Sequence, residues 1–302
     1  MKHATECTNI AFATMVRNEH YFLPKWIQYY SRHVGKDNLY ILLDGADQTV
    51  PPEADGCQVL ALPRRPYGGG WDRNRWDTLE YFAGLLLSRF DVVVLGDVDE
   101  FIVCDPSSGE SLLGALGRAR QSKVISPFAI EVIHRIDLEP PLDPDQPILH
   151  QRKYVRINAS YCKPCIISES VHWSVGGHYS NFAELHLDTN LYLFHLRFLD
   201  RDMLIERQRS RLNVVHQGLA NETSGNGEVA GAGWSKTLTE IDDFLTSFAK
   251  EGPPIDKNFD FGWQRKKIKG DWKWDDLQGV WKHPRLHNRK TYIIPKRFSC
   301  MF

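Results

Sequence analysis

Apolar residues in the first hundred positions follow two alternating patterns. Short runs rich in β-forming residues cover 9–15, 38–43, 59–62 and 91–95. Between them, segments 21–34 and 76–88 carry apolar side chains at the spacing of a helix that buries one face. The order strand, helix, strand, strand, helix, strand predicts an α/β fold, with a mostly parallel sheet and helices on its faces.

The second half of the chain is less regular. Further apolar runs predict strands at 123–133, 153–157 and 190–198. Asp200 is a suitable N-cap for a helix that runs to about Leu212. Residues 218–235 are rich in Gly, Ser, Asn and Ala, which predicts a mobile loop.

The C-terminal segment changes in character, because four tryptophans and eleven Lys or Arg residues fall within 263–297. We expect a helical pair that packs against the sheet and keeps its cations in solvent. Two alternatives stay open: a surface that touches anionic lipid, and a surface that stacks on a sugar acceptor.

Composition narrows the function classes. With 302 residues, the chain is long enough for one large domain or one domain with an extension. The net charge of −1 and the lack of a known nucleic-acid-binding module predict no nucleic-acid partner. No apolar export signal or membrane span is evident, and most of the six cysteines are isolated. We therefore expect a cytoplasmic protein, with peripheral contact at the inner membrane face left open.

The segment FDVVVLGDVDEFIV, residues 90–103, places Asp97, Asp99 and Glu100 directly after a buried strand. Carboxylates this close repel one another, and a Mg²⁺ or Mn²⁺ ion would offset that repulsion. In an extended segment Asp97 and Asp99 would face the ion, while Glu100 would point away. The alternative is a solvated acidic turn. A haloacid-dehalogenase type of phosphotransferase is disfavoured, because its motif requires Thr or Val where this chain has Phe101.

Polar clusters follow three predicted strands at their carboxyl ends: Arg17-Asn18-Glu19, Asp44, and Asp97-Val98-Asp99. In open α/β sheets, ligands bind at this edge. Three clusters at one edge predict a ligand site better than they predict three unrelated loops.

Two ordered segments carry a family resemblance: ATMVRNEHYFLPKWIQYYSRHVGKDNLYILLDGADQ and then VVLGDVDEF. Together they resemble the glycosyltransferase family 2-like proteins of the GT-A fold. The resemblance covers about the first 105 residues and continues weakly through Lys163-Pro164 and His172 to NLYLFHLRF. It implies a Rossmann-like GT-A domain over residues 1–217. The remainder, 218–302, is expected to be an extension that is a loop and then mostly helical.

The resemblance also implies roles for individual residues. The nucleotide-sugar donor would contact residues at the ends of the first two strands: Thr14, Val16, Arg17, Asn18, Glu19 and Asp44. Asp97 and Asp99 would hold a metal ion on its diphosphate, and His195 would complete the metal shell, with a core histidine as the alternative. The departure from the family pattern at Gly45-Ala46-Asp47 leaves the donor base open, with a UDP-sugar favoured.

Three further residues are candidates for the chemistry. Arg73, after the run Gly68-Gly69-Gly70, is a candidate contact of the diphosphate. An inverting reaction needs a carboxylate base, and the candidates are Glu131 and Glu169, with an ordinary surface or capping role as the alternative for each.

The expected function is a metal-dependent hexosyltransferase that uses Mn²⁺ or Mg²⁺. It would move a sugar from the nucleotide-sugar donor to a glycan or lipid-linked acceptor in bacterial surface polysaccharide synthesis. The alternative is an inactive GT-A-like protein that binds sugar nucleotides or glycans. A zinc site of Cys162, Cys165, His172 and His178 is a minor hypothesis, because the spacings are not those of a zinc finger.

Overall fold

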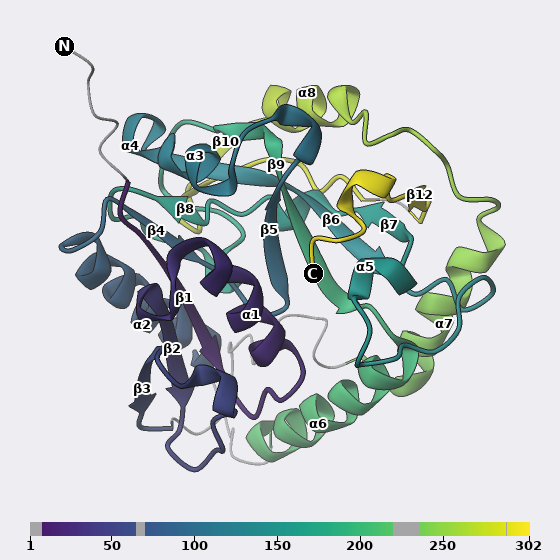
Figure 1. Cartoon of the computed structure of the whole chain (residues 1–302), viewed down its shortest axis with the longest axis horizontal. Helices are drawn as coiled ribbons and strands as arrows, with labels where there is room; N and C mark the ends of the chain where they lie inside the picture. Colours follow the sequence, from purple (N-terminus) through teal and green to yellow (C-terminus); the bar gives the residue numbers. More distant parts are fainter. Residues whose placement is uncertain (1–7, 65–69, 220–235, 288) are drawn as a thin grey trace.

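The computed structural model describes residues 8–64, 70–219, 236–287 and 289–302 (Figure 1). The strands are β1 Ile10–Val16, β2 Leu39–Asp44, β3 Gln58–Leu62, β4 Val92–Leu95, β5 Glu100–Cys104, β6 Val124–Ile133, β7 Tyr154–Ile157, β8 Ile166–Ile167, β9 Leu187–Phe198, β10 Lys273–Asp275, β11 Val280–Lys282 and β12 Tyr292–Ile293. The helices are α1 Phe22–Val34, α2 Trp71–Leu87, α3 Leu112–Gly117, α4 Ala119–Ser122, α5 Ile148–Gln151, α6 Arg201–Leu219, α7 Leu238–Lys250 and α8 Gly262–Gly270.

The central sheet joins a parallel half to a mixed half. Its strand order is β12-β7-β6-β8-β4-β1-β2-β3, and β9 pairs with both β6 and β5. Strands β4, β1, β2 and β3 are parallel, whereas β8 runs antiparallel to β4 and β6. This is the α/β, Rossmann-like arrangement that the sequence predicts, with the mixed half attached through the short strand β8.

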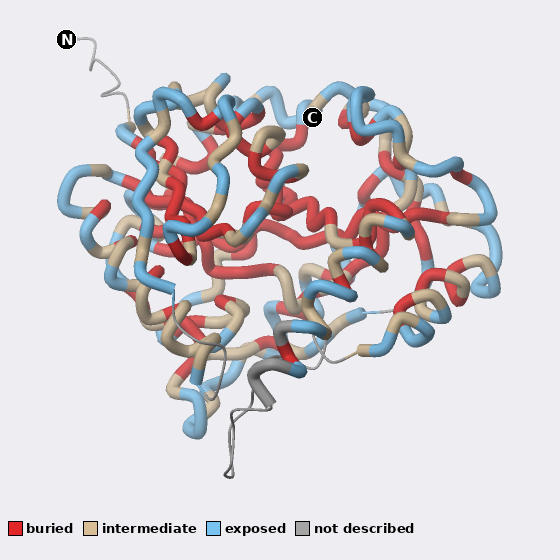
Figure 2. Tube along the Cα trace, turned by 90° about the horizontal axis from the view of Figure 1, so that it is seen from below, coloured by how far each residue is buried: buried red, intermediate tan, exposed pale blue. Residues whose placement is uncertain are grey.

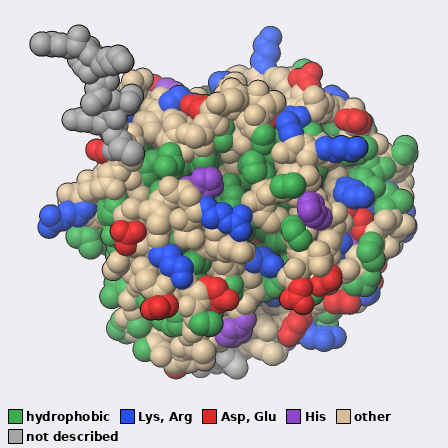
Figure 3. All heavy atoms as spheres, in the orientation of Figure 1, with side chains coloured by type: hydrophobic (Ala, Val, Ile, Leu, Met, Phe, Trp, Pro, Cys, Tyr) green, Lys and Arg blue, Asp and Glu red, His purple; other side chains and the backbone are tan. Residues whose placement is uncertain are grey.

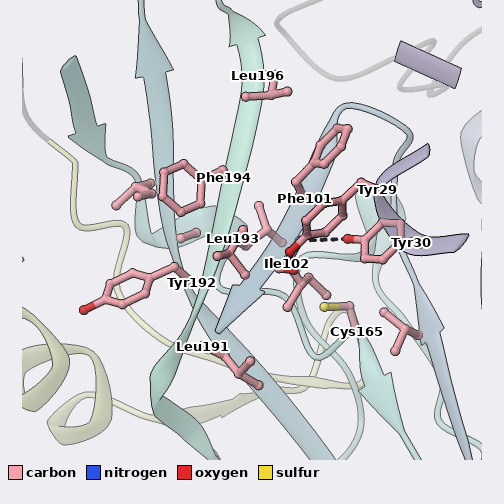
Figure 4. Close-up of a cluster of buried hydrophobic side chains, with 14 of the residues drawn as sticks. Tyr29, Tyr30, Phe101, Ile102, Cys165, Leu191, Tyr192, Leu193, Phe194 and Leu196 are labelled. Carbon is pink, nitrogen blue, oxygen red and sulfur yellow. Dashed lines mark hydrogen bonds between the residues drawn. The ribbon is translucent and has the colours of Figure 1, made fainter. Parts of the chain in front are cut away.

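Alternation along β1 places the two helical layers on opposite faces of the sheet. Phe12 faces the core that contains Trp26 and Tyr30 of α1, whereas Ala13 faces the core that contains Trp76 of α2. Buried backbone runs through the centre of the molecule and exposed segments form its rim (Figure 2). Helix α1 and β5 are also joined by polar contacts within this core. The hydroxyl of Tyr29 donates to the carbonyl of Ile102, 3.0 Å away (Figure 4).

Most predicted elements of the first half are confirmed, with shifted boundaries. Helix α2 begins at Trp71 rather than at Trp76, and α6 continues beyond Leu212. Asp200 caps α6 as predicted, because its Oδ1 accepts from the backbone N–H of Asp202 and of Met203. The predicted loop at 218–235 lies almost wholly outside the described residues.

The C-terminal tail differs from the mostly helical extension that we expected. In its described part, only α7 and α8 are helical for more than one turn, and β10 and β11 then form a hairpin. Strand β12 pairs antiparallel with β7 at the edge of the main sheet. The tryptophans explain the difference, because Trp272 stacks on Trp281 across the hairpin, with ring centroids 6.1 Å apart.

The surface shown in Figure 3 carries interspersed basic and acidic side chains, consistent with the net charge of −1. Among the helices in the described part of the chain, none is both long enough and apolar enough to cross a membrane.

Candidate active site

A cavity of about 940 Å³ opens at the carboxyl ends of β1, β2 and β4. The residues that end these strands form one wall, and the end of β9 and helix α6 form another. Its charged and histidine side chains are Arg17, Glu19, His20, Asp44, Arg64, Asp72, Arg75, Asp97, Asp99, Lys163, His178, His195, Arg197, Glu206, Arg207 and Arg211. The three polar clusters that the sequence placed at one sheet edge therefore share one cavity.

The acidic segment is a turn and not an extended strand. The backbone N–H of Glu100 donates to the carbonyl of Asp97, 3.0 Å away, and β5 begins at Glu100. Asp97 and Asp99 line the cavity and Glu100 does not, as predicted. The reason we gave was wrong, because the separation comes from the turn rather than from strand alternation.

Two cations hold Asp97. Lys163 Nζ lies 3.0 Å from Asp97 Oδ2, and Arg75 Nη2 lies 2.6 Å from Oδ1. Burial alone would raise the pKa of Asp97, but Lys163 and Arg75 hold it well below its usual range. Lys163 also lies 2.6 Å from Glu100, so one buried ammonium group joins both carboxylates.

Asp99 faces a different set of partners. Its Oδ2 lies 3.5 Å from Arg207 Nη1 and 4.0 Å from His195 Nε2. Burial opposes ionisation of Asp99, but His195 and Arg207 outweigh it and lower the pKa. On the other side of the imidazole, His195 Nδ1 lies 3.1 Å from Glu131 Oε1.

These residues fit a divalent cation. Asp99 would supply oxygen and His195 would supply Nε2, while Glu131 would orient the imidazole from behind, as carboxylates do for metal-binding histidines. Mn²⁺ accepts both ligand types, and such ions are often held by only one or two protein side chains plus substrate phosphates. No group of three or more candidate ligands occurs among the described residues, so a substrate would supply the remaining ligands.

The wall at β1 and β2 is built from paired charges. Arg17 forms two contacts with Asp47, of 2.5 and 2.8 Å, and donates to the carbonyl of Asp44 at 3.0 Å. Asn18 lines the cavity beside it in the left-handed conformation, with φ of 49°. Burial raises the pKa of Asp44, and Arg17 and Arg64 oppose that effect.

Glu19 connects two elements at the cavity. Its Oε1 accepts from the backbone N–H groups of Tyr21 and Phe22, which begin α1. Its Oε2 lies 3.0 Å from Arg207 on α6. Of the predicted donor-binding residues, Val16, Arg17, Asn18, Glu19, Asp44 and Asp97 line the cavity.

Four predicted site residues lie elsewhere. Thr14 is fully buried in β1, on the strand face that packs against α1, and is not among the residues that line the cavity. Arg73 points away along α2, toward Asp77 at 2.7 Å and the carbonyl of Trp173. Arg75, two residues further along the helix, reaches the cavity instead.

Neither candidate base lines the cavity. Glu131 is 1% exposed and is ion-paired with Arg156 behind His195. Glu169 is exposed and follows β8. Because β8 runs antiparallel to β4, Glu169 lies at the end of the sheet opposite to the carboxyl end of β4. The carboxylates that sequence reasoning missed are Asp72 and Glu206.

The zinc hypothesis is wrong, because no group of three or more His, Cys, Asp or Glu in the described residues could hold a metal ion, and three of the four residues have other partners. Cys162 is buried and its Sγ accepts from the backbone of Ala129, and burial raises its pKa to about 12. His172 contacts Glu80, and His178 contacts the carbonyl of Ser160.

A scan against protein-family models and a search of curated proteins find no match to this sequence. Solved structures do match. Glucosyl-3-phosphoglycerate synthase from Mycobacterium tuberculosis, in complex with Mn²⁺, UDP and glucosyl-3-phosphoglycerate, is 20% identical with a TM-score of 0.28, over 44% of this chain and 47% of that chain. TarS from S. aureus is 11% identical with a TM-score of 0.34, over 84% of this chain and 44% of that chain.

A third match is mannose-1-phosphate geranyltransferase from Thermus thermophilus, which is 12% identical with a TM-score of 0.26, over 72% of this chain and 65% of that chain. Each match spans less than two thirds of the known protein. At these identities and TM-scores the matches assign neither a function nor a role to any residue of this chain.

Proposed function

We propose that this protein is a glycosyltransferase that uses a nucleotide-diphosphate sugar, with a UDP-sugar as the favoured donor. One observation carries the proposal. The Asp97–Asp99 turn stands at the carboxyl edge of the sheet, between a wall that holds Arg17 and Asp44 and a wall formed by β9 and α6. A nucleoside at the first wall and a sugar at the second would place the diphosphate at the turn.

Asp99 and His195 would hold Mn²⁺ or Mg²⁺, which neutralises charge on the departing diphosphate when bound. Asp97 would act through its partners. By pairing with Arg75 and Lys163, it keeps both cations beside the turn, where they favour negative charge on a leaving group. Glu131 would keep the imidazole of His195 oriented and is a positioning residue.

The acceptor hydroxyl must lose a proton if the reaction inverts the sugar. Asp72 on α2 and Glu206 on α6 are the candidate bases among the described residues, because both line the cavity. Burial raises the pKa of Asp72, with Arg75 opposing, and a raised pKa makes a carboxylate a stronger base. A glycan or lipid-linked acceptor and a role in surface polysaccharide synthesis remain predictions from the resemblance.

The test is a thermal-shift experiment with UDP, Mn²⁺ and both together, with uridine as the control that lacks the diphosphate. Because the two ligands would share the diphosphate, the shift with both should exceed the sum of the separate shifts. Uridine should show no such coupling. GDP and CDP in place of UDP test the choice of base.

Additive shifts with every nucleotide would contradict a shared metal–diphosphate site. Coupled binding without metal-dependent release of sugar from UDP-sugars would instead favour the inactive binding protein.

A further inference from the structure

Three arginines gather on the wall of the cavity beside Asp99. Arg197 lies near the end of β9, and Arg207 and Arg211 lie one turn apart on α6, all three lining the cavity. Arg207 contacts both Asp99, at 3.5 Å, and Glu19, at 3.0 Å. Burial lowers the pKa of Arg211 to about 10, and the charges of Arg197 and Arg207 lower it as well. The three side chains line one cavity, and two of them lie four residues apart on one helix, so their charges repel one another.

Gathering like charges on one wall of a cavity has an electrostatic cost, and a bound anion would offset that cost. Like charges four residues apart on a helix destabilise it, and burial of cations adds to the cost. The carboxylates that line the same cavity include Asp99, Glu19 and the exposed Glu206. Asp99 is the residue that would be taken up by a divalent cation, which would leave the arginines with less negative charge.

The cluster is carried by β9 and α6, and Arg207 extends from α6 to Glu19, which follows β1. In the sheet order, β4 and its acidic turn lie between β1 and β2 on one side and the β6–β9 strands on the other. Arg17 and Asp44 end the first pair, whereas Arg197 is on β9 and α6 follows β9 directly (Figure 1). The arginines therefore lie on the side where a sugar and its acceptor would enter.

We propose that Arg197, Arg207 and Arg211 bind a phosphate group carried by the acceptor. The proposal rests on the proposed function, because it assigns the acceptor of that reaction. Guanidinium groups bind phosphate oxygens in pairs, and several of them can surround one dianionic group. The acceptor would thus be a phosphorylated sugar or a lipid phosphate rather than a neutral glycan.

The experiment measures thermal shifts with glucose 6-phosphate, farnesyl phosphate, glucuronate and glucose, in saturating UDP and Mg²⁺. The variant Arg211→Gln removes one cation of the cluster. Arg209→Gln is the matched control, because Arg209 is exposed on the same helix and does not line the cavity. Arg211→Lys keeps the charge but loses the paired donors, and it replaces Arg211→Gln if that variant does not fold.

We expect the wild type and Arg209→Gln to respond to a phosphate ester and not to glucose. Arg211→Gln should need at least about tenfold more ester for the same thermal shift, because hydrogen bonds between charged groups are lost. The ester concentration that Arg211→Lys needs should lie between those of the wild type and Arg211→Gln. In Arg211→Gln, the response to UDP and Mg²⁺ without ester should fall by less than the response to the ester. Glucose 6-phosphate and farnesyl phosphate distinguish a sugar phosphate from a lipid phosphate.

Three results with a bound ester would overturn the proposal, as would the absence of ester binding: a stronger response to glucuronate than to either ester, an equal ester response in Arg211→Gln, or a parallel loss of the UDP response. The last result would assign the arginines to the donor. If UDP gives no response but the ester still binds through Arg211, the phosphate site stands and the donor assignment fails. If UDP binds and no ester does, only the present inference fails.

Discussion

Three neighbouring carboxylates in this protein have three different environments. Asp97 is paired with Arg75 and Lys163, Glu100 is buried against Lys163, and Asp99 faces His195 and Arg207. The mutual repulsion that the sequence suggests is therefore already relieved by side-chain cations. A metal ion would add to this arrangement at Asp99 only.

The first prediction separates Asp99 from Glu100. Asp99→Asn should weaken Mn²⁺ binding and lower metal-dependent turnover by orders of magnitude, while stability falls by about 1 kcal/mol because Arg207 loses one counter-charge. Glu100→Gln should keep Mn²⁺ affinity but lower stability, because buried Lys163 keeps only Asp97, while burial raises the pKa of Glu100 and offsets part of this loss. Calorimetric Mn²⁺ titration and denaturant unfolding measure both effects.

Equal loss of stability in the two variants would indicate that the whole segment is structural. Unchanged metal-dependent turnover in Asp99→Asn would remove Asp99 from the metal site.

The second prediction concerns Glu131 and pH. Burial alone would raise its pKa, but Arg156 and His195 lower it from 4.5 to about 2. A depressed pKa contributes stability that is present above the unfolded value and is lost as pH falls toward the folded value. The ionised carboxylate of Glu131 therefore adds about 3 kcal/mol to the free energy of unfolding at neutral pH. Unfolding free energies of the wild type and Glu131→Gln should therefore differ at pH 7 and converge as the pH falls from 4.5 to about 2.

Glu131→Gln should also weaken Mn²⁺ binding by about tenfold, because the imidazole of His195 loses its orienting carboxylate. A purely structural Glu131 would change the unfolding curve without changing the Mn²⁺ affinity of the folded protein. A constant stability difference across this pH range would contradict the assigned pKa.

At the scale of elements, the cavity depends on close packing between α2 and the short turn Val175–Gly177, labelled η5. Gly177 has φ of 64°, and a Cβ at this position would lie 2.0 Å from Cη2 of the buried Trp76. Gly176 and His178, on either side of Gly177, line the cavity, and Arg75 precedes Trp76. Contact between these two elements thus sets one side of the site.

The third prediction is that Gly177→Ala destabilises the protein by about 3 kcal/mol, because it combines backbone strain with overpacking against Trp76. Gly109→Ala is the matched control. Gly109 has φ of 70°, but a Cβ added there would have no atom within 4 Å, so only the strain of about 1 kcal/mol should appear. Urea unfolding measures both, and equal losses would show that contact with Trp76 does not matter.

At the scale of the whole molecule, the C-terminal residues close the core rather than forming an appendage. Phe298 is fully buried and packs 5.5 Å from Phe194 of β9, by ring centroids. The ring of Phe302 lies 4.7 Å from that of Phe101. The strand that carries His195 and the strand that follows the acidic turn are therefore both supported by the last residues of the chain.

The fourth prediction compares two aromatic residues of the tail. Phe298→Ala should cost about 4 kcal/mol, because it empties a fully buried ring site. Trp263→Ala should cost less than about 0.5 kcal/mol, because Trp263 is 66% exposed. Thermal and denaturant unfolding provide the comparison, and a small effect of Phe298→Ala would show that the tail is dispensable for the core.

The sequence alone determined the parallel half of the fold. Its strands and helices bury one face each, so their hydrophobic periods are visible locally, and turn residues mark where β1, β2 and β4 end. The same signals brought Arg17, Asp44, Asp97 and Asp99 to one edge, because carboxyl ends of parallel strands meet there.

Only the tertiary structure decided which side chains complete the site. Glu131 and His195 lie 64 residues apart in sequence, and the pairing of β6 with β9 brings them together. Arg75 rather than Arg73 reaches Asp97, because the rotation of α2 against the sheet selects one face of the helix. Such contacts depend on packing between elements that are distant in sequence. The local spacing of apolar and polar residues carries no information about that packing.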